Sequence, residues 1–178
     1  MRNAKWLLVL TLLMASTLGL SACGSNDDEK SYNQTDAAFA ANMLPHHEGG
    51  VKLGEMAVKK GVDPKVKSLG QDIVAAQTRE SETLQGFLRD FGGVSPVMPA
   101  PIEERDMMDM KKLAAASGQE FDLLWLEVIS GHHSAAIQMA EIEKTGGKSP
   151  EAKKLATSII DTQSSELTQF SALLKQME

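Results

Sequence analysis

All four histidines of this chain occur in two adjacent pairs, His46–His47 and His132–His133. Neutral imidazole binds zinc, copper, nickel and iron, and a neighbouring thioether or carboxylate influences which of these metals a site prefers. Met43 precedes the first pair by about one helical turn, and Met139 follows the second pair by about two turns on the same helical stripe. Residues of these types at these spacings are candidate metal ligands.

The two histidine pairs belong to an internal repeat, because the offset of 86 residues between His46 and His132 aligns much of the chain without a gap. Other matched pairs are Asp36 with Asp122, Glu55 with Glu141, Pro64 with Pro150, Ile73 with Ile159, Gln77 with Gln163 and Glu80 with Glu166. In each half, a glycine stop, an Asp or Ser N-cap and then proline mark a turn between two helices. The sequence thus predicts a duplicated helical hairpin.

The elements that must position the histidines are four long helices. Apolar residues recur at alternating steps of three and four, which is the pattern of a bundle seam. The predicted helices cover residues 35–60, 64–91, 119–145 and 150–177, and the repeats cover about 35–92 and 119–178. Between the repeats, a crossover rich in glycine and proline leads into a short helix at about 103–116. The predicted fold class is all-α, with a four-helix bundle domain over residues 35–178.

Polar residues interrupt the seam at one level of this bundle. The helical steps place Gln77 and Glu80 on the seam of the second helix, and the repeat places Gln163 and Glu166 on the fourth. The histidine pairs lie about as far from the hairpin turns, so we expect one shared layer. Such a layer costs free energy unless its groups satisfy one another or bind an ion. The predicted metal ligands are His46, His47, His132, His133, Met43, Met139, Glu80 and Glu166. A His–Glu–Gln network that only sets helix register is the alternative.

The chemistry of these donors indicates which metal they suit. Imidazole with thioether favours copper, particularly Cu(I), whereas imidazole with carboxylate suits zinc, Cu(II) or iron, so another transition metal stays an alternative. A di-iron bundle needs Glu-x-x-His pairs, and the residues three positions before the two seam histidines are methionine and isoleucine. The di-iron signature is therefore absent from the sequence. Met107, Met108 and Met110 add a thioether cluster whose role, ligand or core filling, stays open.

The start of the chain has the pattern of an export signal followed by a tether. Arg2 and Lys5 precede an apolar run that is too short for a membrane-spanning helix, which predicts a signal peptide over residues 1–22. The run ends in Leu-Ser-Ala-Cys, which resembles the lipobox of bacterial lipoproteins, so we expect Cys23 to carry a lipid. Residues 23–34 then form the lipidated cysteine and a flexible polar tether. We expect an exported protein, lipid-anchored to the extracytoplasmic face of a bacterial membrane.

Charge and composition exclude several classes of partner. Loss of the two basic residues of the signal peptide lowers the formal net charge from −6 to −8, which argues against nucleic acid and anionic lipid surfaces. Cys23 is the only cysteine, so no intrachain disulfide forms and no thiolate is left for a metal once it is lipidated. The sequence also offers no nucleophile with a base and orienting partner, and no glycine loop for phosphates. We therefore expect no catalytic residues and no membrane contact beyond the lipid anchor.

The histidine motifs resemble those of the domain-of-unknown-function family 305, DUF305. The resemblance rests on Phe39-x-x-x-Met43-x-x-His46-His47, Gln77-x-x-Glu80, Met110-x-x-Leu113, Phe121-Asp122, His132-His133-x-Ala135-Ala136-Ile137-x-Met139-Ala140 and Gln163-x-x-Glu166, and it runs from about Thr35 to the C-terminus. It implies a ferritin-like four-helix fold and a relation to periplasmic copper-binding proteins linked to copper resistance. Members usually carry methionine at two further positions, where this chain has Leu53 and Ile129.

The leading hypothesis is a non-enzymatic lipoprotein that binds copper or silver through its paired histidines and methionines, for sequestration or handover. The expected partners are metal ions, with a second copy of the chain or a metal-handover partner as open alternatives. One rival is a ferritin-like metallo-oxidase, which would need further carboxylates at the layer. The other rival is a helical interaction module in which the layer only sets the register of the hairpins.

Overall fold

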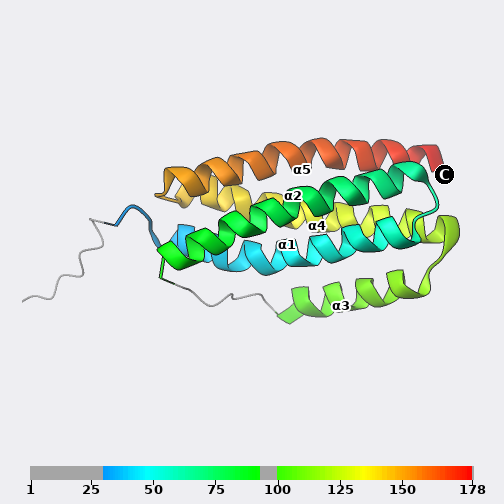
Figure 1. Ribbon diagram of the computed structural model, residues 1–178, viewed down its shortest axis with the longest axis horizontal. Helices are drawn as coiled ribbons and strands as arrows, with labels where there is room; N and C mark the ends of the chain where they lie inside the picture. Colours follow the sequence, from blue (N-terminus) through cyan, green and yellow to red (C-terminus); the bar gives the residue numbers. More distant parts are fainter. Residues whose placement is uncertain (1–29, 93–99, 178) are drawn as a thin grey trace, which may run out of the picture.

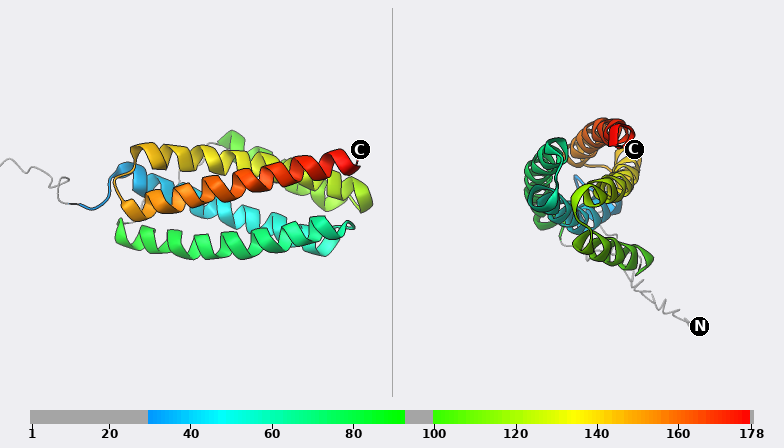
Figure 2. Two further views of the ribbon diagram at one scale, coloured as in Figure 1. Left: turned by 90° about the horizontal axis from the view of Figure 1, so that it is seen from above. Right: turned by 90° about the vertical axis from the view of Figure 1, so that its right-hand side faces the viewer.

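The computed structural model of the chain describes residues 30–92 and 100–177, with residues 100–107 as backbone only. These residues form the helices α1 (Gln34–Lys60), α2 (Pro64–Asp90), α3 (Ala100–Ala115), α4 (Gly118–Gly146) and α5 (Pro150–Met177). α1 and α2 form one hairpin, α4 and α5 form the other, and α3 lies outside the resulting bundle (Figure 1, Figure 2). The predicted all-α four-helix bundle with a short extra helix is confirmed. The predicted signal peptide over 1–22 and Cys23 lie outside the described residues.

The start of α1 lies within the stretch that the sequence assigns to the tether. The Asn33 side chain accepts from the N–H groups of Thr35 and Asp36, while Asp36 accepts from the N–H of Asn33 at 2.6 Å. Such a capping box stabilises a helix start because it satisfies donors that have no partner inside the helix. Tyr32 stacks on Phe91 just beyond α2, with ring centroids 4.6 Å apart. The last residues of the expected tether therefore pack against the bundle.

Each hairpin turn is held by an aspartate from the other hairpin. Asp122 of α4 accepts from the N–H groups of Val62 at 3.1 Å and Asp63 at 2.7 Å, in the turn between α1 and α2. Its repeat partner Asp36 accepts from two N–H groups of the α4–α5 turn, at 2.9 and 2.8 Å. Both aspartates are fully buried, and buried backbone donors need such acceptors. Each hairpin therefore depends on the first helix of the other.

A second carboxyl group accompanies Asp36. Glu143 of α4 is fully buried beside it, whereas the equivalent position of the first repeat is Ala57. Burial, followed by the hydrogen bond and the charge of Asp36, raises the pKa of Glu143 to about 8. Burial also acts to raise the pKa of Asp36, but the backbone N–H groups that it accepts from lower this pKa overall. At neutral pH the Glu143 carboxyl is therefore protonated and can donate to the Asp36 carboxylate.

Apolar side chains fill the bundle on both sides of a central polar layer. Toward the α1–α2 turn the core contains Leu53, Val66, Ile73, Phe121, Trp125, Ile129 and Phe170. Toward the α4–α5 turn it contains Phe39, Met43, Leu84, Ala136, Ala140 and Ile159, with Met139 packed against them. The indole N–H of Trp125 donates to the backbone oxygen of Leu53 at 2.8 Å, which ties α4 to α1. Close packing on both sides fixes the level at which the polar residues meet.

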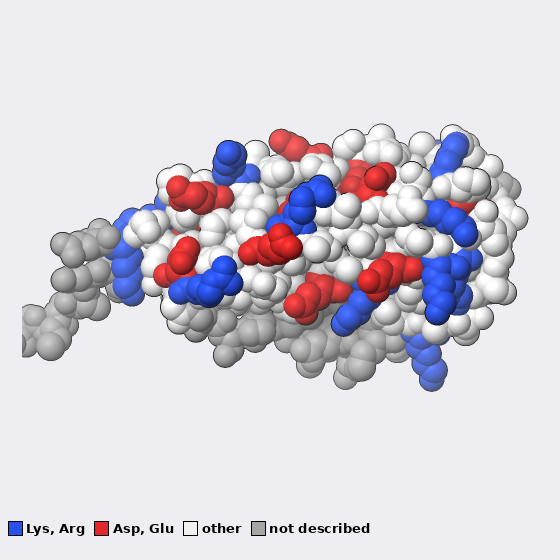
Figure 3. Space-filling model, viewed as in Figure 1, with Lys and Arg blue, Asp and Glu red and all other residues white. Residues whose placement is uncertain are grey.

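The surface of the bundle mixes charges of both signs on the face that Figure 1 presents. Figure 3 shows lysine and arginine side chains interspersed with aspartate and glutamate on this face. Positive side chains gather only toward the right-hand end of this face and do not run along its length, as they would in a surface that follows a nucleic acid backbone. Within the described residues, no helix combines the length and the apolar character that crossing a membrane requires.

Candidate metal centre

The four histidines meet in one layer in the middle of the bundle. His46 on α1 and His132 on α4 lie ring against ring, with centroids 3.8 Å apart. The Nε2–H of His132 donates to the backbone oxygen of His46 at 2.9 Å. His47 and His133 extend to the sides, toward α2 and α5. The packing of α1 against α4 thus brings together residues that are 86 positions apart in the chain.

Each flanking histidine is held by a glutamate of its own hairpin. The Nε2–H of His47 donates to Oε2 of Glu80 at 2.7 Å, and the Nε2–H of His133 donates to Oε2 of Glu166 at 2.7 Å. Both imidazoles are completely buried, whereas the side chains of Glu80 and Glu166 are 16% and 13% exposed. The two glutamates lie in the layer, as the sequence predicts, and there they accept hydrogen bonds from imidazole.

These hydrogen bonds determine which nitrogen of each ring could bind a metal. A neutral imidazole that donates from Nε2 carries its lone pair on Nδ1. In the part of the chain that the structure describes, Nδ1 of His47, His132 and His133 is buried without a hydrogen-bond partner. Histidines that bind metals commonly donate their other N–H to a carboxylate or carbonyl, which fixes the tautomer and the ring orientation. The three rings are oriented in the way that metal-binding histidines are.

The surroundings of His132 keep its ring neutral. Burial lowers the pKa of this imidazole well below its ordinary value of 6.5, and the neighbouring His46 and His133 lower it further. The hydrogen bond to the carbonyl of His46 raises the pKa, but by less than burial lowers it. Metal binding requires a deprotonated nitrogen, so protons do not compete with a metal for His132 at neutral pH.

Two glutamines complete the layer, and a glycine makes room for one of them. Gln77 and Gln163 are 2% and 3% exposed, and among the described residues their side-chain amides have no hydrogen-bond partner. A Cβ at Gly50 would overlap Oε1 of Gln77 and lie 2.8 Å from Cε1 of His132. The sequence alone does not predict this role of Gly50. The only difference that points to it is that the second repeat has Ala136 at the equivalent position. Buried amides without partners are rare in native proteins, and an ion or a water molecule in the layer would satisfy them.

The two predicted thioether ligands lie on the same side of the layer. Met43 is fully buried in the cluster toward the α4–α5 turn, and Met139 packs against that same cluster. Leu53 and Ile129, where the family resemblance predicts methionine, both lie in the cluster on the other side. Because α1 and α4 run in opposite directions, the methionine retained in each repeat reaches the same end. The chain keeps one thioether pair and has aliphatic side chains in place of the other.

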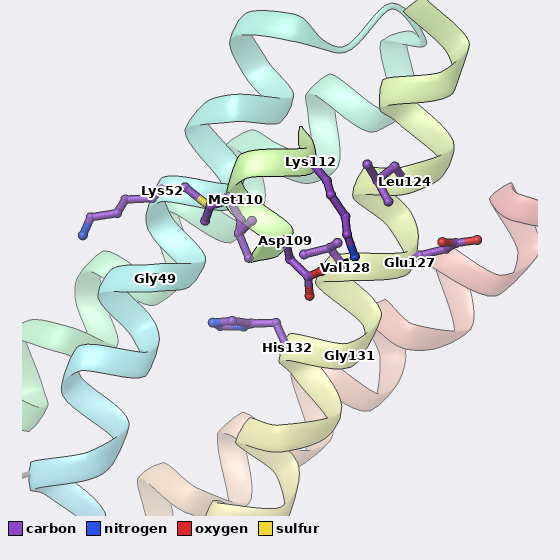
Figure 4. Close-up of a pocket in the computed structure, with 11 residues that line it drawn as sticks. Gly49, Lys52, Asp109, Met110, Lys112, Leu124, Glu127, Val128, Gly131 and His132 are labelled. Carbon is purple, nitrogen blue, oxygen red and sulfur yellow. Dashed lines mark hydrogen bonds and ion pairs between the residues drawn. The ribbon is translucent and has the colours of Figure 1, made fainter. Parts of the chain in front are cut away.

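A cavity of about 750 Å³ opens beside the layer between α1, α3 and α4. Figure 4 shows His132 directed into this cavity from α4, with Asp109 and Met110 of α3 along its wall. Leu53 of α1 and Val128 of α4 add apolar wall. The cavity thus reaches the layer at His132. Of the predicted thioether cluster, Met110 lines the cavity, Met108 is exposed, and the side chain of Met107 lies outside the described part of the chain.

The nitrogen and oxygen donors of the layer are not gathered around a single point. Among the described side chains, which belong to residues 30–92 and 108–177, no group of three or more His, Cys, Asp or Glu is arranged to hold a metal ion. The carboxylates of Glu80 and Glu166 are engaged with imidazoles, so a metal in the layer would draw on imidazole nitrogen and methionine sulfur. Mixed nitrogen and thioether donors suit Cu(I) better than zinc or iron.

The residues that form the bundle and the layer match a known family. The model of the family named domain of unknown function DUF305 matches residues 36–174. The chain belongs to the DUF305 family. The match includes both histidine pairs and reaches into all four long helices, so the resemblance in the motifs is confirmed. Among curated proteins, no significant match to this DUF305 chain was found.

Solved structures of CopM and of other DUF305 proteins resemble this chain. CopM in its Cu(I)-bound form is 30% identical, with a TM-score of 0.69 over 81% of this chain and 98% of that chain. CopM has also been solved in Cu(II)-bound and Ag-bound forms. A DUF305 protein of Streptomyces coelicolor, provisionally described as secreted, is 24% identical, with a TM-score of 0.69 over 80% of this chain and 93% of that one. A DUF305 fragment from Deinococcus radiodurans is 21% identical, with a TM-score of 0.71 over 81% and 97%. The last two likenesses show the shared fold.

Proposed function

We propose that this DUF305 protein binds copper or silver ions in its four-histidine layer, for sequestration or handover. The observation that carries the proposal is the orientation of His47, His132 and His133, whose Nε2–H groups donate to fixed acceptors while Nδ1 is buried without a partner among the described residues. Such buried lone pairs cost free energy unless an ion or a donor satisfies them. CopM, known in Cu(I)-, Cu(II)- and Ag-bound forms, supports the same chemistry.

The residues of the layer have different tasks in this proposal. The imidazoles supply nitrogen donors, and Met43 and Met139 supply sulfur on one side of the layer. Thioether sulfur favours Cu(I), and by the same softness Ag(I), over zinc and harder cations. Glu80 and Glu166 hold the flanking imidazoles in one tautomer and orientation, so they act on the metal through the rings.

Binding without catalysis is the second part of the proposal. The layer contains two glutamates, and each already accepts from an imidazole. A di-iron oxidase of the ferritin-like type takes carboxylates from all four helices. The arrangement therefore favours a binding protein over an oxidase. A test for oxygen consumption by the iron-loaded protein addresses the oxidase directly, and turnover would contradict this part of the proposal.

Export and lipid anchoring form the third part of the proposal. They rest on the signal-like residues 1–22 and on the lipobox-like sequence that ends in Cys23. Membrane fractionation of cells that express the full chain tests both, with Cys23→Ser as the matched variant. Release of the Cys23→Ser protein from the membrane fraction is expected. An unchanged distribution would contradict the lipid anchor.

The central test is an anaerobic titration of the chain from Gly24 onward with Cu(I), against a chromophoric chelator. The unaltered chain is expected to compete for Cu(I), and a variant in which alanine replaces all four histidines is expected not to. Circular dichroism of that variant checks that it remains helical, and single replacements of His46 and His132 serve if it does not. Full competition by a folded variant would contradict binding in the layer. Absence of competition by the unaltered chain would contradict copper binding.

A further inference from the structure

The cavity between α1, α3 and α4 is lined by the thioether of Met110 and the imidazole of His132. We propose that this cavity is a loading site, where a Cu(I) or Ag(I) ion first binds to the thioether of Met110 beside His132 and then moves onto the buried Nδ1 of that imidazole. This inference rests on the metal binding proposed above. It adds a residue of α3, which lies outside the four-helix bundle, to those that handle the ion.

His132 connects the cavity with the buried layer. It lines the cavity and is 8% exposed, whereas His47 and His133 are completely buried. Its ring centroid lies 3.8 Å from that of His46, so an ion at His132 is already beside a second imidazole. Inward movement then needs only the exchange of neutral donors: the thioether sulfur releases the ion as an imidazole nitrogen binds it. The ion keeps its oxidation state throughout.

Met110 supplies sulfur on the cavity wall. It is partly buried, packs against the core near the α1–α2 turn, and borders the same cavity as His132 (Figure 4). The charged residues that line the cavity are Lys52, Lys112, Asp109 and Glu127, two of each sign. Asp109 is also paired with Lys112 at 3.3 Å. Because these charges balance, a cation is held there by donor chemistry, and thioether sulfur selects a soft ion.

Gly131 offers a way to fill the cavity without disturbing the bundle. It lines the cavity directly before His132, and a Cβ built there has no heavy atom within 4 Å. Leucine at this position would occupy open space and obstruct the approach to His132. Gly86, a glycine inside α2 that is not among the cavity residues, provides the matched control.

The first test follows the methionine ε-methyl groups by NMR during titration with Ag(I), which is diamagnetic. The Met110 methyl resonance is expected to shift, and that of Met108, which is 57% exposed on the same helix, is expected to stay. The Met110 shift should persist in a His46→Ala, His133→Ala variant, which weakens the layer and keeps His132. If the Met110 resonance did not shift with Ag(I) in either the unaltered protein or this variant, the loading site would be overturned. A Met110 response without tight binding in the layer would support the loading site and contradict the proposed function.

The second test measures Cu(I) uptake by stopped flow. Met110→Leu and Gly131→Leu are expected to slow uptake severalfold, whereas Met108→Leu and Gly86→Leu keep the original rate. All four variants should retain the equilibrium affinity for Cu(I), because the layer is unchanged. Unaltered rates in both cavity variants would overturn the proposal. So would a loss of affinity in Met110→Leu as large as in the four-histidine variant, since Met110 would then belong to the final site.

Discussion

Glu80 accepts a hydrogen bond from the Nε2–H of the buried His47 at 2.7 Å, and this contact leaves the lone pair of the ring on Nδ1. The same contact recurs between His133 and Glu166. The repeat therefore duplicates an oriented imidazole and not merely a histidine. Each carboxylate binds Nε2 and so determines that Nδ1 is the nitrogen available to a metal. In the proposed metal site, the carboxylates therefore orient the ligands and are not ligands themselves.

Replacement of Glu80 by glutamine should weaken Cu(I) binding by about tenfold, because the amide oxygen still accepts the hydrogen bond but lacks the negative charge that favours a metal cation on the other ring nitrogen. Competition against a Cu(I) chelator measures the effect. Glu82→Gln, at an exposed position of the same helix, should leave the affinity unchanged. If Glu80→Gln removed binding as completely as loss of the histidines, the carboxylate would itself be a ligand.

A Met43→Leu, Met139→Leu variant should lose Cu(I) affinity and keep most of its Cu(II) affinity, because Cu(II) relies on the imidazoles. Methionine and leucine differ little in volume, so each exchange should cost less than about 1.5 kcal/mol of stability. Parallel titrations with the two oxidation states measure the difference. Met56→Leu, at a partly buried position in the other core cluster, is the control. Equal losses for Cu(I) and Cu(II) would contradict a thioether contribution.

The replaced methionine positions allow the converse experiment. Leu53 and Ile129 lie in one core cluster, on the side of the layer opposite to Met43 and Met139. A Leu53→Met, Ile129→Met variant should therefore gain a second thioether pair and bind more Cu(I) ions per chain. Metal analysis after removal of loosely bound Cu(I) measures the ratio. An unchanged ratio together with unchanged affinity would contradict the pairing of these positions.

Alanine should have opposite effects at two glycines of the bundle. At Gly131 a Cβ meets nothing within 4 Å, so Gly131→Ala should stabilise the protein by about 0.5–1 kcal/mol through helix propensity. At Gly50 a Cβ would overlap Gln77 and crowd His132, so Gly50→Ala should destabilise the protein and weaken metal binding. Urea denaturation compares both variants. Stabilisation by both substitutions would mean that the layer tolerates the added methyl group.

Glu143 should make the stability of the fold decrease as the pH rises from about 5 to about 8. Its pKa is about 8 in the folded protein against an ordinary 4.5, so the folded state binds a proton more tightly than the unfolded chain. The stabilising contribution is present below the ordinary pKa and is lost as the pH rises through the folded value. Thermal melts from about pH 5 to about pH 8 should therefore show a falling Tm that levels off above the folded pKa, with a smaller decrease in Glu143→Gln. Glu141→Gln, whose side chain is 49% exposed, should keep the original slope, and three equal slopes would contradict the assignment.

Much of the fold could be predicted because its signals are local. Glycine, an N-cap residue and proline mark both hairpin turns, and the predicted helices 64–91 and 150–177 agree closely with Pro64–Asp90 and Pro150–Met177. One apolar stripe per helix indicates a bundle. Equal rise per residue from the turn then places His47 level with Glu80, and the structure shows these two side chains in contact.

The remaining features depend on which helices become neighbours. The position of Asp122 against the α1–α2 turn, and the common side of Met43 and Met139, follow from how α4 packs on α1. A hydrophobic period does not specify this packing. The role of Gly50 likewise depends on where the Gln77 amide lies in space. The cavity at Met110 depends on the placement of a helix outside the bundle, for which the seam pattern carries no information.

Each hairpin contributes an aspartate that binds the turn of the other hairpin. This reciprocal contact resembles an isologous dimer interface, here formed within one polypeptide. Asp36 binds the turn of the second hairpin as Asp122 binds the turn of the first, which is how two identical subunits meet across a two-fold axis. In a true homodimer every substitution appears twice. Fusion of the two halves removes that constraint, so equivalent positions of the two repeats can carry different residues. Met43 corresponds to Ile129, and Glu143 corresponds to Ala57. One-sided sulfur and a single extra carboxyl group are asymmetries that only a fused pair of hairpins can evolve.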